Sequence, residues 1–157
     1  MNWIDGPVYD CRVTPLHKFV DERGWLAEVF RQDNLDAMHH PVMAYLSLTH
    51  PGVARGPHEH VRQTDLFVFF SGLFRLYLWD ARAASPSYGH RHVIDLGEAS
   101  PASVLVPPGV VHAYRNVGTR DALILNCPNA LYAGQGKAAP VDEIRHEDRT
   151  DHLFMIS

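Results

Sequence analysis

Short apolar segments separated by turn residues are the feature that most restricts what this chain can fold into. Glycine, proline and serine punctuate these segments, as in PPG at 107–109 and GT at 118–119. Period-two alternation bounded by such residues is typical of β-strands, and a helical period is nearly missing. We expect about nine or ten short strands, the clearest over residues 8–13, 25–30, 43–49, 66–70, 74–79, 92–96, 103–106, 110–116 and 122–126. The pattern predicts an all-β antiparallel sandwich or barrel, of which the jelly roll is one form.

The length of the chain fits a single domain. With 157 residues, of which 46% are apolar and 20% charged, the chain can bury a core without disulfides or metal clips. We therefore expect residues 1–157 to form one domain. Residues 31–40 predict a short helical turn or loop. Periodicity is lost after Tyr132, so residues 133–157 are expected to form an irregular, loosely docked tail.

Charge and composition argue against several classes of partner. The formal net charge is −4 and no basic cluster is present, which argues against a nucleic-acid partner. No apolar run reaches the ~18 residues that a membrane span needs, and the opening MNWIDGPVYD lacks the features of a signal peptide. The two cysteines, Cys11 and Cys127, are far apart in sequence. They favour a reduced, cytoplasmic protein over a disulfide-bonded one.

One stretch places several chemically active side chains close together. His58 and His60 are one residue apart, so on a strand their side chains leave the same face. Asp65 stands at the head of the next apolar segment, and the three side chains converge if the two strands pair. His112, just after a tight turn, supplies a third imidazole. Such groups are costly inside a barrel unless they serve a purpose, and this set suits an Fe, Mn, Ni, Zn or Cu ion.

The same residues belong to two longer spacing patterns. The first is G-x5-H-x-H-x4-D-x6-G, and the second is P-x-G-x2-H-x3-N. Their members are Gly52, His58, His60, Asp65 and Gly72, and then Pro107, Gly109, His112 and Asn116. Both patterns resemble the two motifs of the cupin superfamily, with aspartate where cupins usually carry glutamate. The resemblance implies a cupin double-stranded β-helix, which is a jelly-roll barrel.

A narrower resemblance covers most of the chain. The segments DERG at 21–24, GVARGPH at 52–58, SPSYG at 85–89 and VPPGVVH at 106–112 are similar to those of the dTDP-4-dehydrorhamnose 3,5-epimerase family. The resemblance implies a keto-deoxysugar carried on dTDP as substrate, with no metal cofactor. It makes His58 the general base that removes a proton beside the keto group. It also places Arg23, Glu28 and Arg55 on the nucleotide and His112 in the sugar pocket.

The resemblance further implies a homodimer. Members of that family exchange N-terminal strands, which here fall within residues 1–30. Exposed sheet edges also favour pairing between copies. The expected partners are therefore a dTDP-sugar and a second copy of the chain.

Three positions depart from that family's pattern. Asp65 stands where the family has a lysine, Asn126 where it has an acid tyrosine, and His60 where glutamine commonly follows the base. The family's aspartate that pairs with the base lies in a C-terminal extension that this chain largely lacks. Tyr114 shares the face of His112 and is the best aromatic candidate for the pocket.

Three functions remain open at this point. The first is an epimerase-like sugar-nucleotide enzyme, with catalytic residues His58, Asp65 and His112 and substrate-binding residues Arg23, Glu28, Arg55, Tyr114 and Asn126. The second is a metal-dependent cupin dioxygenase or isomerase, with ligands His58, His60, Asp65 and His112. The third is a non-catalytic small-molecule binder.

Overall fold

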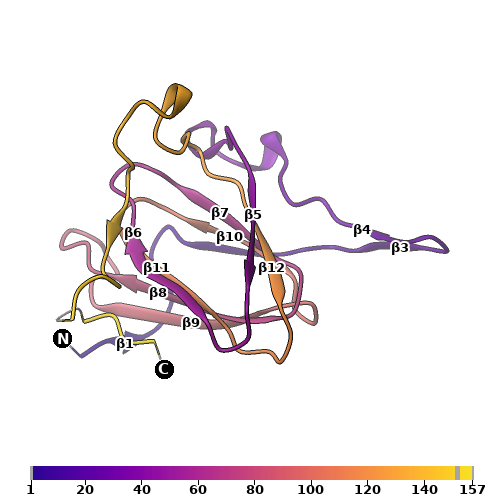
Figure 1. Cartoon of the computed structure of the whole chain (residues 1–157), viewed down its shortest axis with the longest axis horizontal. Helices are drawn as coiled ribbons and strands as arrows, with labels where there is room; N and C mark the ends of the chain where they lie inside the picture. Colours follow the sequence, from indigo (N-terminus) through magenta and orange to yellow (C-terminus); the bar gives the residue numbers. More distant parts are fainter. Residues whose placement is uncertain (1, 151–152, 157) are drawn as a thin grey trace.

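Two facing β-sheets make up the body of the computed structural model, which describes residues 2–150 and 153–156 (Figure 1). The first sheet has the order β1 (Ile4–Asp5), β9 (His90–Gly97), β8 (Leu73–Asp80), β11 (Val110–Asn116), β6 (Ala54–Glu59) and β13 (Ile144–Arg145). The second has the order β2 (Arg12–Pro15), β10 (Ala102–Val106), β7 (Asp65–Phe69), β12 (Ala122–Asn126) and β5 (Tyr45–Thr49). The strands pair antiparallel except β1 with β9. The predicted all-β cupin jelly roll is confirmed.

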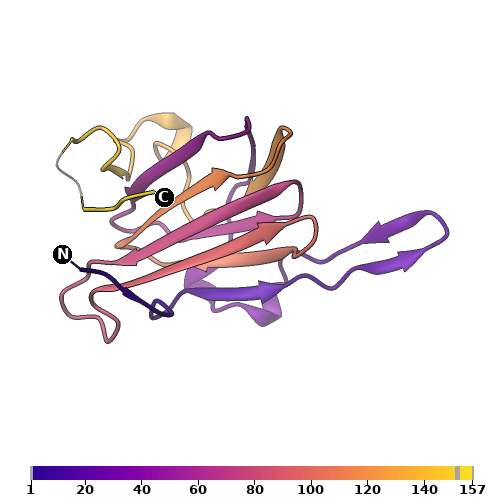
Figure 2. The ribbon, with the colours of Figure 1, turned by 90° about the horizontal axis from the view of Figure 1, so that it is seen from below.

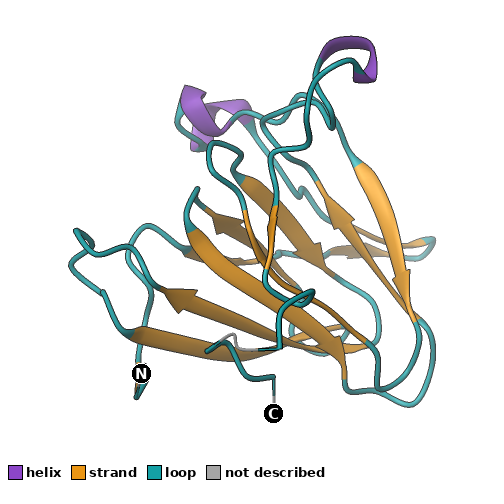
Figure 3. Cartoon of the chain, turned by 60° about the vertical axis from the view of Figure 1, so that its left-hand side comes forward, coloured by secondary structure: helices purple, strands orange, loops and turns teal. Residues whose placement is uncertain are grey.

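Three short 3-10 turns complete the described part of the chain. They are η1 (Gln32–Asn34), η2 (Ala37–His39) and η3 (Gln135–Lys137). All three gather at the end of the molecule opposite the two chain termini (Figure 3). The first two fall within the segment predicted as a helical turn or loop. Within the residues that the structure describes, no helix is long and apolar enough to cross a membrane.

The core lies between the inner faces of the two sheets. On β7, Phe67 and Phe69 point inward, while Leu66 packs in a separate cluster on the other face. On β8, Leu76 and Leu78 point inward, opposite Trp79. Burying each large apolar side chain in this way contributes roughly 1.5–3 kcal/mol to the stability of the fold. The alternation read from the sequence therefore builds the barrel and decides which polar side chains share its interior.

Strand pairing and strand limits differ from the expectation in places. The strands that carry His58 and Asp65 do not pair, because β6 and β7 belong to different sheets. The predicted strand over residues 8–13 is wrong in its first half. The amide of Cys11 donates to the carbonyl of Val8, and Asp10 has a φ of 65°. This turn delays the strand, so β2 begins only at Arg12.

A two-stranded hairpin extends away from the body. It consists of β3 (Phe19–Asp21) and β4 (Gly24–Leu26), and Figure 2 shows it projecting beyond the two sheets. β4 ends earlier than the strand predicted over residues 25–30, and among the described residues only β3 pairs with it. The hairpin leaves four large apolar side chains half or more exposed, namely Phe19, Val20, Trp25 and Leu26.

The described part of the C-terminal segment contains little regular structure but makes specific contacts with the body. β13 pairs with β6 and places Ile144 opposite Glu59. The amides of His146 and Glu147 both donate to the carbonyl of Pro57. Phe154 is buried against the outer face of β8 with its ring 5.7 Å from that of Trp79. The tail therefore covers the outer side of the first sheet and one edge of the histidine-bearing strand.

Candidate active site

A glycine turn fixes the position of His58. Gly56 has a φ of +82°, and a Cβ there would lie 2.6 Å from the carbonyl oxygen of His112. Only glycine allows β6 to approach β11 this closely in that conformation. As a result His58 and His112 are directly opposite in the strand register, and their ring centroids are 4.5 Å apart.

Asp65 reaches the same place from the opposite sheet. Its side chain is 1% exposed, and its Oδ1 accepts hydrogen bonds from Gln63 at 2.9 Å and Asn126 at 2.8 Å. Its Oδ2 lies 3.1 Å from Nε2 of His60 and 3.3 Å from Nε2 of His112. The four side chains converge because the inner faces of the two sheets meet there, without the strand pairing that the sequence suggested.

His60 is held between two oxygen acceptors. Its Nδ1 donates to the carbonyl of Asp142 in the tail, and its Nε2 faces the Asp65 carboxylate. Burial alone would lower the pKa of His60, but the hydrogen bond and the charge of Asp65 raise it overall. For Asp65, burial alone would raise the pKa, but the imidazoles of His112 and His60 hold it well below its usual range. Each group therefore favours the charged form of the other in the barrel interior.

His58 has a different environment. Its Nδ1 is buried without a hydrogen-bond partner, and burial, followed by the charges of His112 and His60, lowers its pKa to about 2. The imidazole is therefore neutral, and the lone pair of this nitrogen is not engaged by a donor. The Glu143 and Glu147 carboxylates lie 3.8 Å and 3.9 Å from that Nδ1. These two glutamates flank β13, which pairs with β6 and so brings them beside the histidine.

Asn126 and Tyr45 line the opposite wall. Asn126 is fully buried, and its Nδ2 donates both to Asp65 and to the phenol oxygen of Tyr45, at 2.9 Å. Tyr114 is 4% exposed and donates to Ser47 at 3.2 Å. It shares the face of His112 as expected, but it is packed deep in the aromatic core.

The three imidazoles also form a group that fits a metal ion. One ring nitrogen from each of His58, His60 and His112 lies within 4.8 Å of the others. Nδ1 of His58 is buried without a hydrogen-bond partner, and Nε2 of His112 faces the Asp65 carboxylate at 3.3 Å. Neutral imidazole nitrogens with a neighbouring carboxylate are ligands for divalent transition metals. The donor set therefore fits such an ion.

Comparison with known proteins identifies the family. The sequence matches the family model for dTDP-4-dehydrorhamnose 3,5-epimerase over residues 6–149. Agl13 of Haloferax volcanii, a probable low-salt glycan biosynthesis epimerase, is 34% identical over 126 residues, which cover 80% of this chain and 81% of that protein. The spore coat polysaccharide biosynthesis protein SpsL of Bacillus subtilis is 36% identical over 122 residues, or 78% of each chain. The chain belongs to the dTDP-4-dehydrorhamnose 3,5-epimerase family.

Solved structures agree on the fold. A dTDP sugar isomerase from Desulfovibrio desulfuricans G20 matches with a TM-score of 0.79 and 24% identity, over 94% of this chain and 88% of that one. A dTDP-6-deoxy-D-glucose-3,5-epimerase from Legionella pneumophila, solved in complex with dTDP-4-keto-L-rhamnose, matches with a TM-score of 0.75 and 20% identity, over 92% and 76%. As a member of this epimerase family, the protein is an epimerase-like enzyme of nucleotide-sugar chemistry.

Three residues that the family resemblance assigns to the nucleotide do not gather beside His58 within one chain. Arg55 extends from β6 to β5, where its guanidinium donates to Thr49 and to the carbonyl of Leu48. Arg23 is 83% exposed near the turn of the projecting hairpin and pairs with Asp21.

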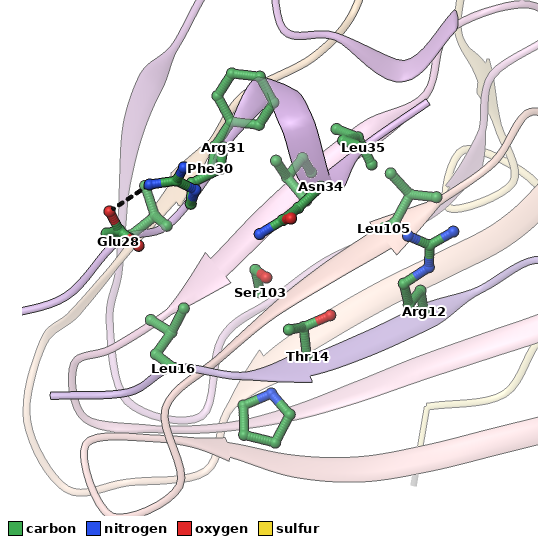
Figure 4. A pocket seen from close by; sticks show the side chains of 13 residues that line it. Arg12, Thr14, Leu16, Glu28, Phe30, Arg31, Asn34, Leu35, Ser103 and Leu105 are labelled. Carbon is green, nitrogen blue, oxygen red and sulfur yellow. Dashed lines mark hydrogen bonds and ion pairs between the residues drawn. The ribbon is translucent and has the colours of Figure 1, made fainter. Parts of the chain in front are cut away.

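Glu28 lines a separate pocket of about 150 Å³ on the outer face of the second sheet (Figure 4). There it accepts a hydrogen bond from Arg31 at 3.1 Å. Leu66 and Leu105 form part of the wall of this pocket and face away from the barrel interior. In a single chain, Glu28 is therefore separated from the histidine cluster by the second sheet.

The sequence reasoning missed three side chains of the site. Glu143 and Glu147 lie in a segment without periodicity, and β13 is only two residues long, so no local pattern marked them. Tyr45 lies within the strand predicted over residues 43–49, where nothing local distinguishes it from a core residue. Its register opposite Asn126, which depends on long-range pairing, is what brings it to the site.

Proposed function

We propose that the protein binds a dTDP-4-keto-6-deoxyhexose and inverts a carbon next to the keto group, with His58 as the general base. The observation that carries this proposal is the state of His58, a neutral imidazole with an unpartnered Nδ1 inside the barrel mouth. A proton next to a carbonyl leaves once a base is positioned and the enolate is stabilised. The names of the relatives and the ligand of the Legionella pneumophila structure support the substrate class.

The surrounding groups have distinct tasks in this mechanism. Glu143 and Glu147 stabilise the imidazolium that His58 becomes when it accepts the proton. Asp65 is a positioning residue that holds His60 and His112 in place. Because aspartate replaces the family's lysine here, the enolate oxygen is met by an imidazole edge rather than by an ammonium group.

The test is isotope incorporation. Wild-type protein in D₂O with dTDP-4-keto-6-deoxyglucose should replace the hydrogen next to the keto group with deuterium and form an epimer, both followed by proton NMR. Absence of exchange and of epimer at high enzyme concentration would contradict the proposal. The matched variant His92→Gln changes an imidazole on β9, outside the cluster, and should behave as wild type.

We infer further that the enzyme is a homodimer in which the hairpin of one copy reaches the site of the other. The hairpin projects from the body and exposes large apolar side chains at more than half of their surface, among them Val20 and Leu26. Such side chains are normally covered by a partner. Arg23 near its turn would then meet the nucleotide bound by the partner.

Mixing inactive variants tests this arrangement. Arg23→Ala and His58→Gln should each be inactive as pure dimers. After unfolding and refolding together, hybrid dimers contain one intact site, so about a quarter of the wild-type activity should return for a two-fold dimer. A mixture that stays inactive would show that Arg23 serves the site of its own chain, and a monomer by light scattering would refute the dimer.

A second candidate function is a metal-dependent enzyme. The grouped nitrogens of His58, His60 and His112, with Asp65 beside them, favour it. A divalent ion held there would polarise the keto oxygen of a substrate as a Lewis acid. Elemental analysis of purified protein, with and without reconstitution, decides the matter. One transition metal per chain that is lost in His112→Gln supports this function, and no metal after reconstitution contradicts it.

We also propose a cytoplasmic location. Cys11 and Cys127 are both free, and disulfides are rare in reducing compartments. Burial raises the pKa of Cys11 to about 12 and also raises that of Cys127, so both thiols are unreactive. Fractionation of the native host with an antibody against the protein would check this assignment.

A further inference from the structure

An epimerase needs a proton donor as well as a base. After the base removes a proton, the enolate is planar, and inversion requires a new proton from the opposite face. His58 lies on β6 in the first sheet, so the donor must come from the facing wall, which the second sheet forms. This inference rests on the proposed epimerase function.

Tyr45 occupies that wall. It is the first residue of β5 and lies directly opposite Asn126 in the strand register. Its phenol oxygen accepts a hydrogen bond from Nδ2 of Asn126, which also donates to the buried Asp65. Since the phenol oxygen is the acceptor in this contact, the O–H proton of Tyr45 is not used there and remains available for a substrate.

The exposure of Tyr45 suits a group that meets a ligand. Its side chain is 44% exposed, whereas its partner Asn126 is fully buried. The ring therefore stands at the mouth of the barrel with its hydroxyl anchored inward. Burial, together with the charges of Asp65 and Glu143, raises the pKa of Tyr45 to about 12, so the phenol keeps its proton at neutral pH. Glu143 also lies beside His58, at 3.8 Å from its Nδ1.

Another phenol that points into the barrel is less suitable. Tyr114 is 4% exposed and donates its proton to Ser47. Its ring lies 5.8 Å from that of Phe67 and 5.7 Å from that of Phe74. The hydroxyl proton of Tyr114 is already donated to Ser47 and its ring is enclosed by other aromatic rings, so the hydroxyl cannot reach a sugar at the mouth of the barrel.

We propose that Tyr45 is the general acid that returns a proton to the sugar on the face opposite His58. In the first step the C–H bond next to the keto group breaks, His58 takes the proton, and the electron pair moves onto the carbonyl oxygen as an enolate. In the second step the enolate re-forms the carbonyl, a new C–H bond forms with the Tyr45 proton, and a phenolate remains. The phenolate then takes a proton from water and the imidazolium returns one to water, so the cycle is balanced.

Tyr45→Phe separates the two half-reactions. The base still removes a proton and can return a deuteron from solvent on the same face. We therefore expect deuterium exchange next to the keto group within a fewfold of the wild-type rate, while epimer formation falls by roughly 10²–10⁴-fold. The exchange itself reports that the variant is folded and binds substrate. Tyr88→Phe removes a half-exposed phenol in the loop between β8 and β9 and should match wild type in both measurements.

The outcomes divide cleanly. Epimer formation by Tyr45→Phe at the wild-type rate overturns the assignment while leaving the proposed function intact. Equal loss of exchange and epimerisation also overturns it, because Tyr45 then acts before or during enolate formation. Wild-type protein that neither exchanges nor epimerises refutes the proposed function and this inference together.

Discussion

Replacing Asp65 with alanine should strongly destabilise the fold. The carboxylate is 1% exposed, accepts hydrogen bonds from Gln63 and Asn126, and lies within 3.3 Å of both His60 and His112. Removing one partner of a buried charge pair costs about 3–5 kcal/mol, and each donor left unsatisfied costs about 1–3 kcal/mol on its own. Because these losses share one network and do not add, we expect about 4 kcal/mol in total.

Urea unfolding measures this loss. For a slope of about 2 kcal/mol per M, the midpoint of Asp65→Ala should fall by about 2 M, with chelator present in all samples. Asp95→Ala is the matched control, because this carboxylate pairs with Arg75 at 2.7 Å while 46% exposed. The free energy of unfolding of Asp95→Ala should fall by less than about 1 kcal/mol. Equal midpoints for the two variants would refute the reasoning that the site is a buried, fully connected network.

Other contacts give further predictions. Glu143→Gln and Glu147→Gln should each slow isotope exchange, measured by NMR, about tenfold. This factor corresponds to a loss of about 1.4 kcal/mol in the stabilisation of the His58 imidazolium. Unchanged rates in both variants would show that the two carboxylates take no part in the mechanism. Burial alone would raise the pKa of Asp80, but the hydrogen bonds from Arg82 and two loop serines hold it well below its usual range. The stability that this group adds is therefore present above about pH 4, the unfolded pKa, and is lost as pH falls. Acid unfolding of Asp80→Asn, followed by circular dichroism, should show a shallower loss below that pH than wild type. Phe154→Ala should lower the free energy of unfolding by about 3 kcal/mol, and a change below about 0.5 kcal/mol would show that the tail is not docked.

Local pattern was enough to predict the fold and part of the site. Period-two alternation placed His58 and His60 on one face of a strand. The tight turn before His112 placed the His112 side chain near the start of a second strand. Because inward-facing positions of a small barrel share one interior, these imidazoles could be brought together without knowledge of the sheet order.

Long-range pairing explains what the sequence could not supply. Neighbouring segments suggested that β6 and β7 pair, but the connection between them crosses from one sheet to the other. Glu143 approaches the base only through a two-residue strand, which is too short to show a period. Tyr45 reaches Asn126 through the register of β5 against β12, which depends on how the whole second sheet assembles.

Isotope exchange by a His58 variant tests most directly whether this histidine is the base. The side chain is neutral, lacks a hydrogen-bond partner at Nδ1 and lies beside two carboxylates. In D₂O with dTDP-4-keto-6-deoxyglucose, His58→Gln should incorporate deuterium next to the keto group at least about 10²-fold more slowly than wild type, as expected when a general base is removed. Incorporation by His58→Gln at the wild-type rate would show that His58 is not the base.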